Sequence, residues 1–353
     1  MVSQMHYKIV GVMSGTSLDG LDLVLVDFQK LNHKWKFSIQ KAETVAYPET
    51  IVQNLKHAVD FSQPQIQELD ISLGQFIGTT IKIFIGNSSV DFIASHGHTI
   101  FHQPENRYTL QIGSGEKISE ESGLPVINNF RAKDVSLGGQ GAPLVPIGDR
   151  DLFSEYTYCL NLGGIANISF ERDNARIAFD ICPFNMALNE LANQSELAYD
   201  DKGVMASGGI VDHQLLEALS KIPYLSSTGP KSLGLEDYQK YWQPLITSST
   251  LSLKDKMCTF TEHAALEIGK QLAGTQADKT LVTGGGTFHD YFISRLKLHS
   301  DTTIFIPDRQ TIEFKEALIF AYLGLLRYLD EPNCLSSVTG ASEDSSGGDL
   351  YNF

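Results

Sequence analysis

The sequence is poor in basic residues, has few cysteines and contains no long apolar run. Its 27 Lys and Arg face 42 Asp and Glu, a formal net charge of −15. Nucleic-acid backbones are held by dense basic clusters, so this balance argues against a general nucleic-acid binder. No stretch is long and apolar enough for a membrane span, and the first residues, 1–8, lack the apolar core of a secretion signal. We expect a cytoplasmic protein with no nucleic-acid or membrane partner.

Paired cysteines and two common nucleotide motifs are also missing. Four cysteines are scattered along the chain without metal-ligand spacing, namely Cys159, Cys182, Cys258 and Cys334. This pattern is typical of reduced thiols in the cytoplasm rather than of a disulfide framework. The Walker pattern is absent, and no Gly-x-Gly-x-x-Gly run follows a strand, which disfavours P-loop and Rossmann domains.

A chain of 353 residues exceeds the usual size of one hydrophobic core, so we expect two domains with a ligand cleft between them. A Gly- and Pro-rich segment, 137–146, separates the halves, and we place the domains at 1–135 and 136–353. The polar tail from Val338 is expected to be a loop or a loosely held terminus, and it could pack back on the first domain.

Apolar periodicity predicts a mixed α/β fold. Strands are expected at 7–13, 21–28, 90–94, on both sides of a turn within 158–170, at 176–180 and at 279–283, and helices at 49–60, 65–84, 261–272, from the 284–286 turn to 298, and at 313–329. The hairpin within 158–170 repeats the layout of the opening hairpin, apolar strand, small-residue turn and apolar strand. This echo predicts two related halves.

Glycine-rich turns at strand ends are the first chemical signal. The turn from Met13 to Gly20 can converge backbone N–H groups on a phosphate, and Asp19 and Asp22 can act on the water shell of a metal ion. Alone, such a turn is more often an ordinary polar hairpin. Two further turns, 163–167 and 284–286, favour a nucleotide held between two domains.

Four runs then point to a family. Residues 11–22 (GVMSGTSLDGLD), 137–146 (LGGQGAPLVP), 161–167 (NLGGIAN) and 338–341 (VTGA) resemble the signature runs of anhydro-N-acetylmuramic acid kinases. The resemblance implies the actin-like fold shared by sugar kinases, heat-shock chaperones and actin. It further implies a homodimer that uses ATP and Mg²⁺ to phosphorylate 1,6-anhydro-N-acetylmuramic acid while water opens the ring, giving N-acetylmuramic acid 6-phosphate in peptidoglycan recycling.

The resemblance also implies roles for individual residues. Asp180 matches the catalytic base and Glu316 a glutamate that positions the water, although a strand-end Asp is otherwise commonly a cap and a helical Glu an exposed residue. Nucleotide contacts are implied for Ser14, Gly15, Thr16, Ser17, Leu18, Asp19, Gly20, Leu21, Asp22, Gly163, Gly164, Asn167, Gly284, Gly285 and Gly286. Sugar contacts are implied for His96, Thr99, Arg131, Asp134 and Pro183, and no metal site made of protein ligands is expected.

Two of these assignments have alternatives. The run 95–102 (SHGHTIFH) contains three histidines that could suggest zinc, but no fourth ligand follows at a recognisable spacing. Arg131 could bind the sugar's lactyl carboxylate through its guanidinium fork, or form a surface ion pair with Asp134.

The chain departs from the family pattern at four places. Ile181-Cys-Pro-Phe184 stands for Thr-Gly-Pro-Gly, and these bulkier groups are expected to affect how the sugar fits. His98 replaces Gln, His289 replaces Asn, and the run 230–236 (PKSLGLE) lacks the family's Thr and Arg. Two other functions therefore stay open, a kinase of this fold for a different sugar and a chaperone-like or regulatory ATPase.

Overall fold

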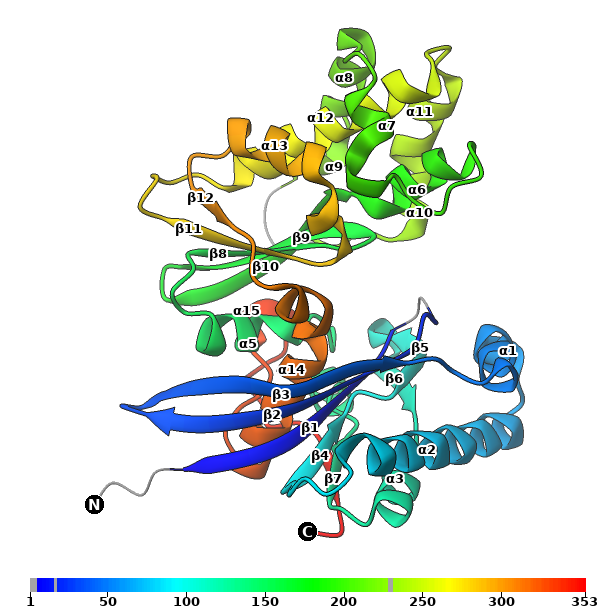
Figure 1. Ribbon diagram of the computed structural model, residues 1–353, viewed down its shortest axis with the longest axis vertical. Coiled ribbons are helices and arrows are strands. Elements are labelled where there is room, and N and C mark those ends of the chain that lie inside the picture. The colour runs from blue at the N-terminus through cyan, green and yellow to red at the C-terminus, as the bar shows by residue number, and fades with distance from the viewer. Residues whose placement is uncertain (1–4, 16–17, 228–230) are drawn as a thin grey trace. The chain divides into compact units, whose positions relative to one another are not determined.

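The computed structural model describes residues 5–15, 18–227 and 231–353 (Figure 1). These divide into a first unit, Met1–Leu152 with Phe314–Phe353, and a second unit, Phe153–Glu313. The second unit is thus inserted into the first, whereas the sequence suggested one crossover near residue 135. The predicted domain bounds, 1–135 and 136–353, stay a prediction. The chain enters the second unit at Phe153 and returns to the first unit at Phe314.

The first unit is built on a sheet of six strands within the described residues, in the order β13-β7-β4-β1-β2-β3. β1, β2 and β3 are antiparallel, while β4 and β7 run parallel to β1. The strands are β1 (His6–Ser14), β2 (Leu21–Leu31), β3 (Lys34–Val45), β4 (Phe92–Ser95), β7 (Val126–Asn128) and β13 (Asp349–Tyr351).

Helices cover both faces of this sheet. On one face Val10 and Val12 of β1 pack in a buried cluster with Leu73 of α2 (Gln63–Ile85). On the other, Gly11 lies against α14 (Arg309–Tyr328), so closely that a Cβ at Gly11 would stand 2.0 Å from the carbonyl oxygen of Ala317. Only glycine permits this approach, because any side chain would separate strand and helix.

The remaining elements of the first unit surround this sheet. They are α1 (Glu49–His57), η1 (Ala58–Asp60), β5 (His98–Gln103), η2 (Pro104–Asn106), β6 (Tyr108–Ile112), α3 (Gly115–Ser122), α4 (Ala132–Ser136), α5 (Val145–Leu152) and α15 (Ser336–Thr339). β5 and β6 form a separate antiparallel hairpin. The last residues are not the loose loop that polarity suggested, since β13 pairs with β7.

The second unit repeats the strand arrangement of the first. Its order, β10-β9-β8-β11-β12, corresponds to β3-β2-β1-β4-β7, with three antiparallel strands followed by two parallel ones. The strands are β8 (Tyr158–Leu162), β9 (Ile165–Arg172), β10 (Ala175–Pro183), β11 (Lys279–Thr283) and β12 (Thr303–Phe305). The repeated strand order agrees with the expected two related halves and with the expected actin-like α/β fold.

Helices of the second unit gather on α12 (Leu253–Gln271), whose Phe260, Ala264 and Ile268 are fully buried. The other elements are α6 (Asn185–Asn193), η3 (Asp201–Gly203), α7 (Val204–Ser207), α8 (His213–Ser220), α9 (Pro223–Ser226), α10 (Leu235–Asp237), η4 (Tyr238–Trp242), α11 (Gln243–Ser248), η5 (Gly285–Phe288) and α13 (Asp290–His299).

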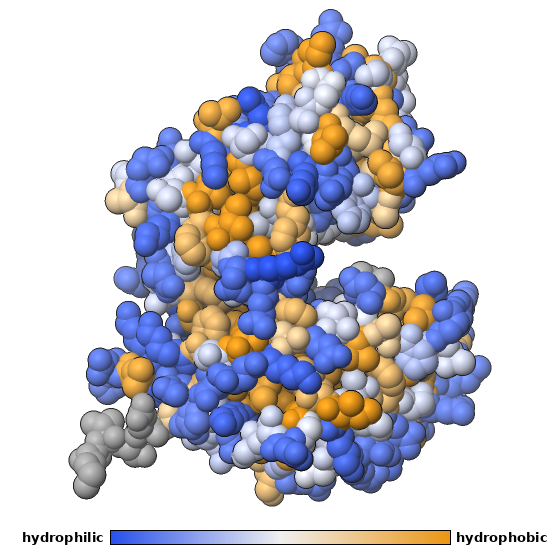
Figure 2. All heavy atoms as spheres, in the orientation of Figure 1, coloured by the Kyte–Doolittle hydropathy of each residue, from blue (hydrophilic) through white to orange (hydrophobic). Residues whose placement is uncertain are grey.

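The surface fits the acidic, moderately apolar composition. On the face drawn in Figure 2, hydrophilic side chains cover much of each unit, with apolar ones dispersed among them. Among the residues that the structure describes, no helix combines the length and apolarity of a membrane span.

Candidate functional site

Ser14 closes β1 at the opening hairpin and is held inside the first unit. Its hydroxyl accepts a hydrogen bond from the Tyr47 hydroxyl (2.7 Å) and lies 2.8 Å from Nδ1 of His98. Burial raises the pKa of Tyr47 to about 12 and lowers that of His98, so Tyr47 keeps the proton that it donates and the His98 ring is neutral. His98, which replaces the family's Gln, thus supports the hairpin.

The rest of the opening turn has mixed surroundings. Leu18 has φ 57° and its N–H contacts the carbonyl of Gly15 at 3.3 Å, while Thr16 and Ser17 lie outside the described residues. Asp22 accepts a hydrogen bond from the Thr44 hydroxyl at 2.6 Å. The Leu21 side chain is fully buried. Of the residues implied to bind nucleotide here, Leu21 contributes backbone and packing; Gly15, Leu18, Asp19, Gly20 and Asp22 stay predictions.

Arg131 follows β7 and is braced by two acceptors. Its Nε donates to Nε2 of His96 at 3.0 Å, and its Nη1 donates to the carbonyl of Gly141 at 2.6 Å. His96 in turn contacts the Gly97 carbonyl through Nδ1 at 2.8 Å and packs on Phe320. Burial and the charge of Arg131 hold the pKa of His96 well below its usual value, so the ring is neutral.

This bracing leaves Arg131 able to bind an anion. Burial lowers its pKa to about 10, so it remains a cation at neutral pH. Within the described part of the chain its Nη2 has no hydrogen-bond partner. Neither interaction involves Asp134, so the alternative of an Arg131–Asp134 ion pair is not what the structure contains.

Asp134 instead ties three segments together. Its Oδ2 accepts the N–H of Gly141 at 2.7 Å, and its Oδ1 accepts the Cys334 thiol at 3.1 Å and the Thr339 hydroxyl at 2.7 Å. Asp134 is 1% exposed. Its direct contact with a sugar stays a prediction; what the structure assigns it is the joining of the 137–146 loop to the 338–341 run.

Glu316 lies on α14 near two cations. Its side chain reaches solvent, yet the surrounding protein removes enough water to raise its pKa, while the charges of Arg131 and Lys315 act in the opposite direction. Lys315 is itself buried in an ion pair with Asp149, 2.7 Å from Nζ to Oδ1. Glu316 and Arg131, predicted from distant parts of the sequence, therefore influence each other electrostatically.

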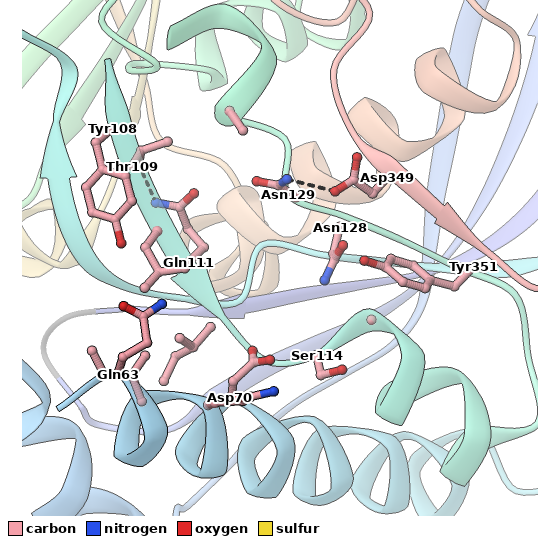
Figure 3. A pocket seen from close by; sticks show the side chains of 16 residues that line it. Gln63, Asp70, Tyr108, Thr109, Gln111, Ser114, Asn128, Asn129, Asp349 and Tyr351 are labelled. Carbon is pink, nitrogen blue, oxygen red and sulfur yellow. Dashed lines mark hydrogen bonds between the residues drawn. The ribbon is translucent and has the colours of Figure 1, made fainter. Parts of the chain in front are cut away.

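Thr99 lies on β5, and its hydrogen-bond partner Gln111 on β6 lines a pocket of about 610 Å³ (Figure 3). Gln111 of β6 points its Nε2 at the hydroxyls of Thr109 (2.8 Å) and Thr99 (3.4 Å). Among the described residues, no basic side chain lines the pocket, but the two acidic side chains of Asp70 and Asp349 do line it. This lining does not suit phosphate. The three histidines of the 95–102 run have separate partners, with His102 contacting Thr109 at 3.1 Å.

In the second unit, the turn between β8 and β9 supports the start of α6. The carbonyl of Gly164 accepts the N–H groups of Phe184 (2.8 Å) and Met186 (3.1 Å), and that of Gly163 accepts the N–H of Asn185 at 3.1 Å. Gly164 is exposed and Gly163 half-buried, and an added Cβ would make only ordinary contacts, with no atom closer than 3.4 Å at Gly163 and 3.9 Å at Gly164. The turn is therefore accessible to a ligand.

The third glycine turn lies beside the second one. β8 and β11 are parallel neighbours, with Asn161 opposite Thr283, so the turns that follow them meet. Gly284 has φ 85° and a Cβ there would stand 2.6 Å from Oδ1 of Asn161, which requires glycine. Gly285 is open, with its nearest neighbour, Nδ2 of Asn185, at 4.0 Å from an added Cβ. The structure thus brings together two turns that are more than a hundred residues apart.

Asp180 lies on β10 in register with Asn167 of β9, beside a bulge before Cys182. Its Oδ2 accepts the N–H of Leu233 at 2.8 Å. Burial raises the pKa of Asp180, and the Leu233 bond partly opposes this. A raised pKa places a carboxylate closer to the range of an effective general base.

The departures after Asp180 point into the core. Ile181 is 2% exposed, and Cys182 and Phe184 are fully buried. Phe184 packs edge-on to Phe292, with ring centroids 4.5 Å apart. Gly286 makes room for it, because a Cβ there would stand 2.3 Å from the Phe184 ring. These groups fill the core beneath the turn, so they reach no exposed surface from which to contact a sugar; their expected effect on how the sugar fits stays a prediction. Pro183 is buried as well, and its sugar contact stays a prediction.

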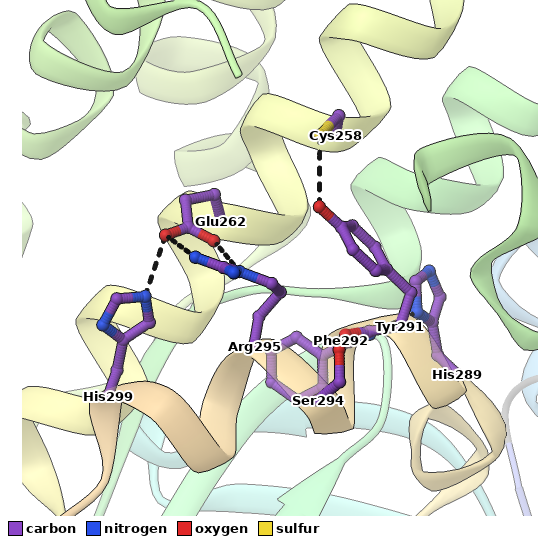
Figure 4. Close-up of polar contacts among 8 residues, drawn as sticks. All are labelled: Cys258, Glu262, His289, Tyr291, Phe292, Ser294, Arg295 and His299. Carbon is purple, nitrogen blue, oxygen red and sulfur yellow. Dashed lines mark hydrogen bonds and ion pairs between the residues drawn. The ribbon is translucent and has the colours of Figure 1, made fainter. Parts of the chain in front are cut away.

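His289 anchors the third turn to its surroundings (Figure 4). Its Nδ1 accepts the N–H of Phe292 at 3.0 Å, and its Nε2 lies 3.9 Å from Oδ2 of Asp200. Further along α13, Arg295 binds Glu262 through two hydrogen bonds (2.6 and 2.9 Å), and His299 lies 2.8 Å from the same carboxylate. These contacts fasten α13, and with it the 284–286 turn, to α12.

The amino-acid sequence matches one known protein family. Residues 7–352 fit the sequence profile of anhydro-N-acetylmuramic acid kinase. This chain belongs to the anhydro-N-acetylmuramic acid kinase family. Proteins of that name from Crocosphaera subtropica (34% identical, covering 97% of this chain and 98% of theirs), Saccharophagus degradans (32%, 97% and 98%) and Shewanella loihica (34%, 98% and 98%) are similar over nearly their full lengths.

Solved structures resemble the chain only loosely. The ROK hexokinase from Thermus thermophilus aligns with 90% of this chain and 99% of its own at 11% identity and a TM-score of 0.38. Component A of (R)-2-hydroxyglutaryl-CoA dehydratase from Acidaminococcus fermentans aligns with 89% and 96% at 11% identity and 0.41. Membership of the anhydro-N-acetylmuramic acid kinase family makes the chain a sugar kinase.

Two supporting residues were not found from the sequence. Tyr47 and Leu233 contact Ser14 and Asp180 directly, yet the sequence assigned a role to neither residue. Leu233 does fall in the run 230–236, whose resemblance to the family marked it without giving it a role. Tyr47 precedes Pro48 in a segment with no such signal.

Proposed function

We propose that this kinase transfers the γ-phosphoryl group of ATP to 1,6-anhydro-N-acetylmuramic acid while water opens the anhydro bridge, giving N-acetylmuramic acid 6-phosphate and ADP. The observation that carries the proposal is that Asp180, a carboxylate with a raised pKa, lies in the same unit as two neighbouring glycine turns, in which Gly164 and Gly285 are exposed. Curated relatives bearing the name of this activity support the choice of sugar.

The glycine turns fit a nucleotide. Gly163, Gly164 and Gly285 leave room for close backbone approach, which a phosphate or ribose needs. In the first unit, Asp19 and Asp22 supply the carboxylate oxygens that suit the water shell of Mg²⁺. Bound Mg²⁺ would neutralise charge on the transferring phosphoryl group.

Asp180 acts as general base in this mechanism. Its Oδ2 is held by the Leu233 N–H, which leaves Oδ1 to accept a proton from water. The water oxygen forms a bond to C1 of the sugar, the bond between C1 and O6 breaks, and O6 takes the phosphoryl group. The proton of the water ends on Asp180, so atoms and charge balance.

Arg131 and Glu316 serve the sugar in the first unit. Two nitrogens of Arg131 are fixed by His96 and Gly141, so the guanidinium is oriented before it meets the lactyl carboxylate. This orientation lowers the entropy that binding would cost. Glu316, whose pKa is raised by desolvation, orients the attacking water.

A kinase for a different sugar was suggested by residues 181–184. Because these side chains lie in the core, they give no reason to expect a changed acceptor. We also propose, from the family resemblance, a cytoplasmic homodimer acting in peptidoglycan recycling, and light scattering of the purified protein tests the dimer.

The test is a phosphorylation assay with the anhydro sugar, N-acetylmuramic acid and N-acetylglucosamine, read by product mass. The proposal expects turnover of the anhydro sugar to a product that has gained phosphate and one water. Phosphorylation only of the ordinary sugars would favour the other kinase. ATP turnover that needs no acceptor and survives Asp180→Asn would favour a regulatory ATPase.

A further inference from the structure

The short segment Lys231–Leu233, for which the sequence suggested no role, runs beside the outer strand of the second unit at Asp180. The N–H of Asp180 donates to the carbonyl of Lys231 at 3.0 Å, and the N–H of Leu233 donates to the Asp180 carboxylate at 2.8 Å. β10 is the last strand of its sheet, so this side of Asp180 would otherwise lack a backbone partner.

Tyr224 completes the contacts around Asp180. Its hydroxyl donates to the carbonyl oxygen of Asp180 at 2.8 Å. The backbone N–H, the backbone carbonyl and one carboxylate oxygen of Asp180 are therefore bound by Lys231, Tyr224 and Leu233, respectively. A side chain held at its backbone and at one oxygen retains few orientations.

The clamping segment is itself anchored. Lys231 donates to the carbonyl of Tyr224 at 3.1 Å, and its Nζ lies 4.5 Å from the centre of the Tyr224 ring and 5.8 Å from that of Phe179. Tyr224 packs against Trp242, 6.0 Å between ring centroids, and Trp242 is fully buried. The lysine and its aromatic neighbours thus connect the segment to the core through a cation–π contact.

We propose that the backbone N–H of Leu233 and the hydroxyl of Tyr224 are positioning groups for Asp180, and that Lys231 holds them in place. This inference rests on the proposed role of Asp180 as base. It assigns a function to the segment Lys231–Leu233: the segment sets both the direction and the basicity of the base rather than contacting the sugar.

The Leu233 bond has a predictable sign. A hydrogen bond to a carboxylate favours its charged form, so removing the bond raises the pKa of Asp180 further above its ordinary value. Tyr224 on α9 and Cys182 on β10 interact electrostatically with Asp180, and Lys231, Asp237 on α10 and Glu267 on α12 act on those two neighbours. None of these is changed by a substitution at Leu233.

A matched pair of variants isolates the N–H group. Leu233→Pro removes the N–H, whereas Leu233→Ala removes the same buried side chain and keeps it. Protein labelled with ¹³C at aspartate carboxyls is titrated by NMR, with Asp180 assigned by its loss in Asp180→Asn. We expect the Asp180 titration to move up by about one pH unit in Leu233→Pro relative to Leu233→Ala. Equal midpoints in the two variants would overturn the inference.

Tyr224→Phe tests the other group and guards against misfolding of the proline variant. It deletes one hydroxyl and keeps the ring packing, with Tyr241→Phe from the same aromatic cluster as control. We expect kcat to fall about 10-fold at unchanged KM in Tyr224→Phe only, because the base is misdirected and sugar binding is untouched. Unchanged kcat would contradict the positioning role. The NMR titration needs no turnover, so it distinguishes a failure of this inference from a failure of the proposed reaction.

Discussion

The two units hold their predicted functional residues by different means. In the first, side chains brace side chains: His96 orients Arg131, and Cys334 and Thr339 bind Asp134. In the second, the main chain does most of this work. Glycine carbonyls accept the first N–H groups of α6, and the Leu233 N–H holds Asp180. Conservative side-chain changes should therefore affect the first unit most, and changes of backbone freedom the second.

Asp180→Asn should lower kcat more than any other substitution, because Asp180 is the proposed general base that accepts the proton of water. Asparagine keeps an oxygen for the Leu233 N–H but cannot accept the proton of water. We expect kcat to fall by about 10²–10⁴-fold with KM for both substrates nearly unchanged, measured by steady-state kinetics. Asp173→Asn, in the exposed β9–β10 turn, is the control and should leave kcat intact. A loss below 10-fold would remove Asp180 from the role of base.

Arg131→Lys should give the next largest effect and tests side-chain bracing in the first unit. Lysine keeps the charge but cannot contact His96, Gly141 and a carboxylate in one plane. We expect KM for the anhydro sugar to rise roughly 10- to 100-fold with KM for ATP unchanged. Arg309→Lys, in an exposed ion pair with Glu313, serves as control. An unchanged sugar KM would show that the braced guanidinium does not bind the substrate.

Alanine substitutions at the adjacent residues Gly285 and Gly286 distinguish the contribution of core packing from that of ligand access in the second unit. Gly286→Ala forces a methyl group against Phe184, and we expect it to lower the free energy of unfolding by about 1–3 kcal/mol in urea denaturation. Gly285→Ala meets no atom within 4 Å except Nδ2 of Asn185 at 4.0 Å, so stability should change by less than about 0.5 kcal/mol.

For nucleotide binding, we expect the opposite order, with the larger change in Gly285→Ala. Gly285→Ala places a methyl group where we propose that ATP approaches, and KM for ATP should rise about 10-fold. A normal KM in a stable Gly285→Ala protein would place the nucleotide elsewhere.

The smallest effect is expected for Cys334→Ala. The thiol is a weak donor, and Thr339 and Gly141 still bind Asp134 without it. We expect a loss of about 1 kcal/mol in unfolding free energy and unchanged kinetics. Thr339→Val, which removes the stronger hydroxyl donor, should cost more. The reverse order would mean that the thiol is the main support of Asp134.

Much of the fold could be predicted from periodicity. The helix expected at 65–84 is α2, and the repeated hairpin at 158–170 is β8 and β9, because both carry long, regular apolar patterns. The return of the chain to the first unit at Phe314 could not be located, since α14 is one continuous apolar helix that spans both units. β13 was not predicted because it has only three residues, Asp349–Tyr351, and becomes a strand only by pairing with β7, which lies far away in the sequence.

The site was predictable in its members but not in their contacts. Glycine turns and the family runs identified Gly163, Gly285 and Asp180. Local sequence gives no sign that Cys182 and Phe184 point inward, because that direction is fixed by the bulge after Asp180 and the room left at Gly286. Nor does it show that Leu233, 53 residues away, holds the base.

The most direct test of the central claim is turnover of the anhydro sugar in H₂¹⁸O, with mass and fragmentation analysis of the product. We expect one ¹⁸O per product molecule, on C1 of the sugar and absent from the phosphate, and formation of this product at least about 100-fold more slowly with Asp180→Asn. A phosphorylated sugar without ¹⁸O would contradict water attack at C1, and ¹⁸O found only in free phosphate would show that the protein hydrolyses ATP without transferring it.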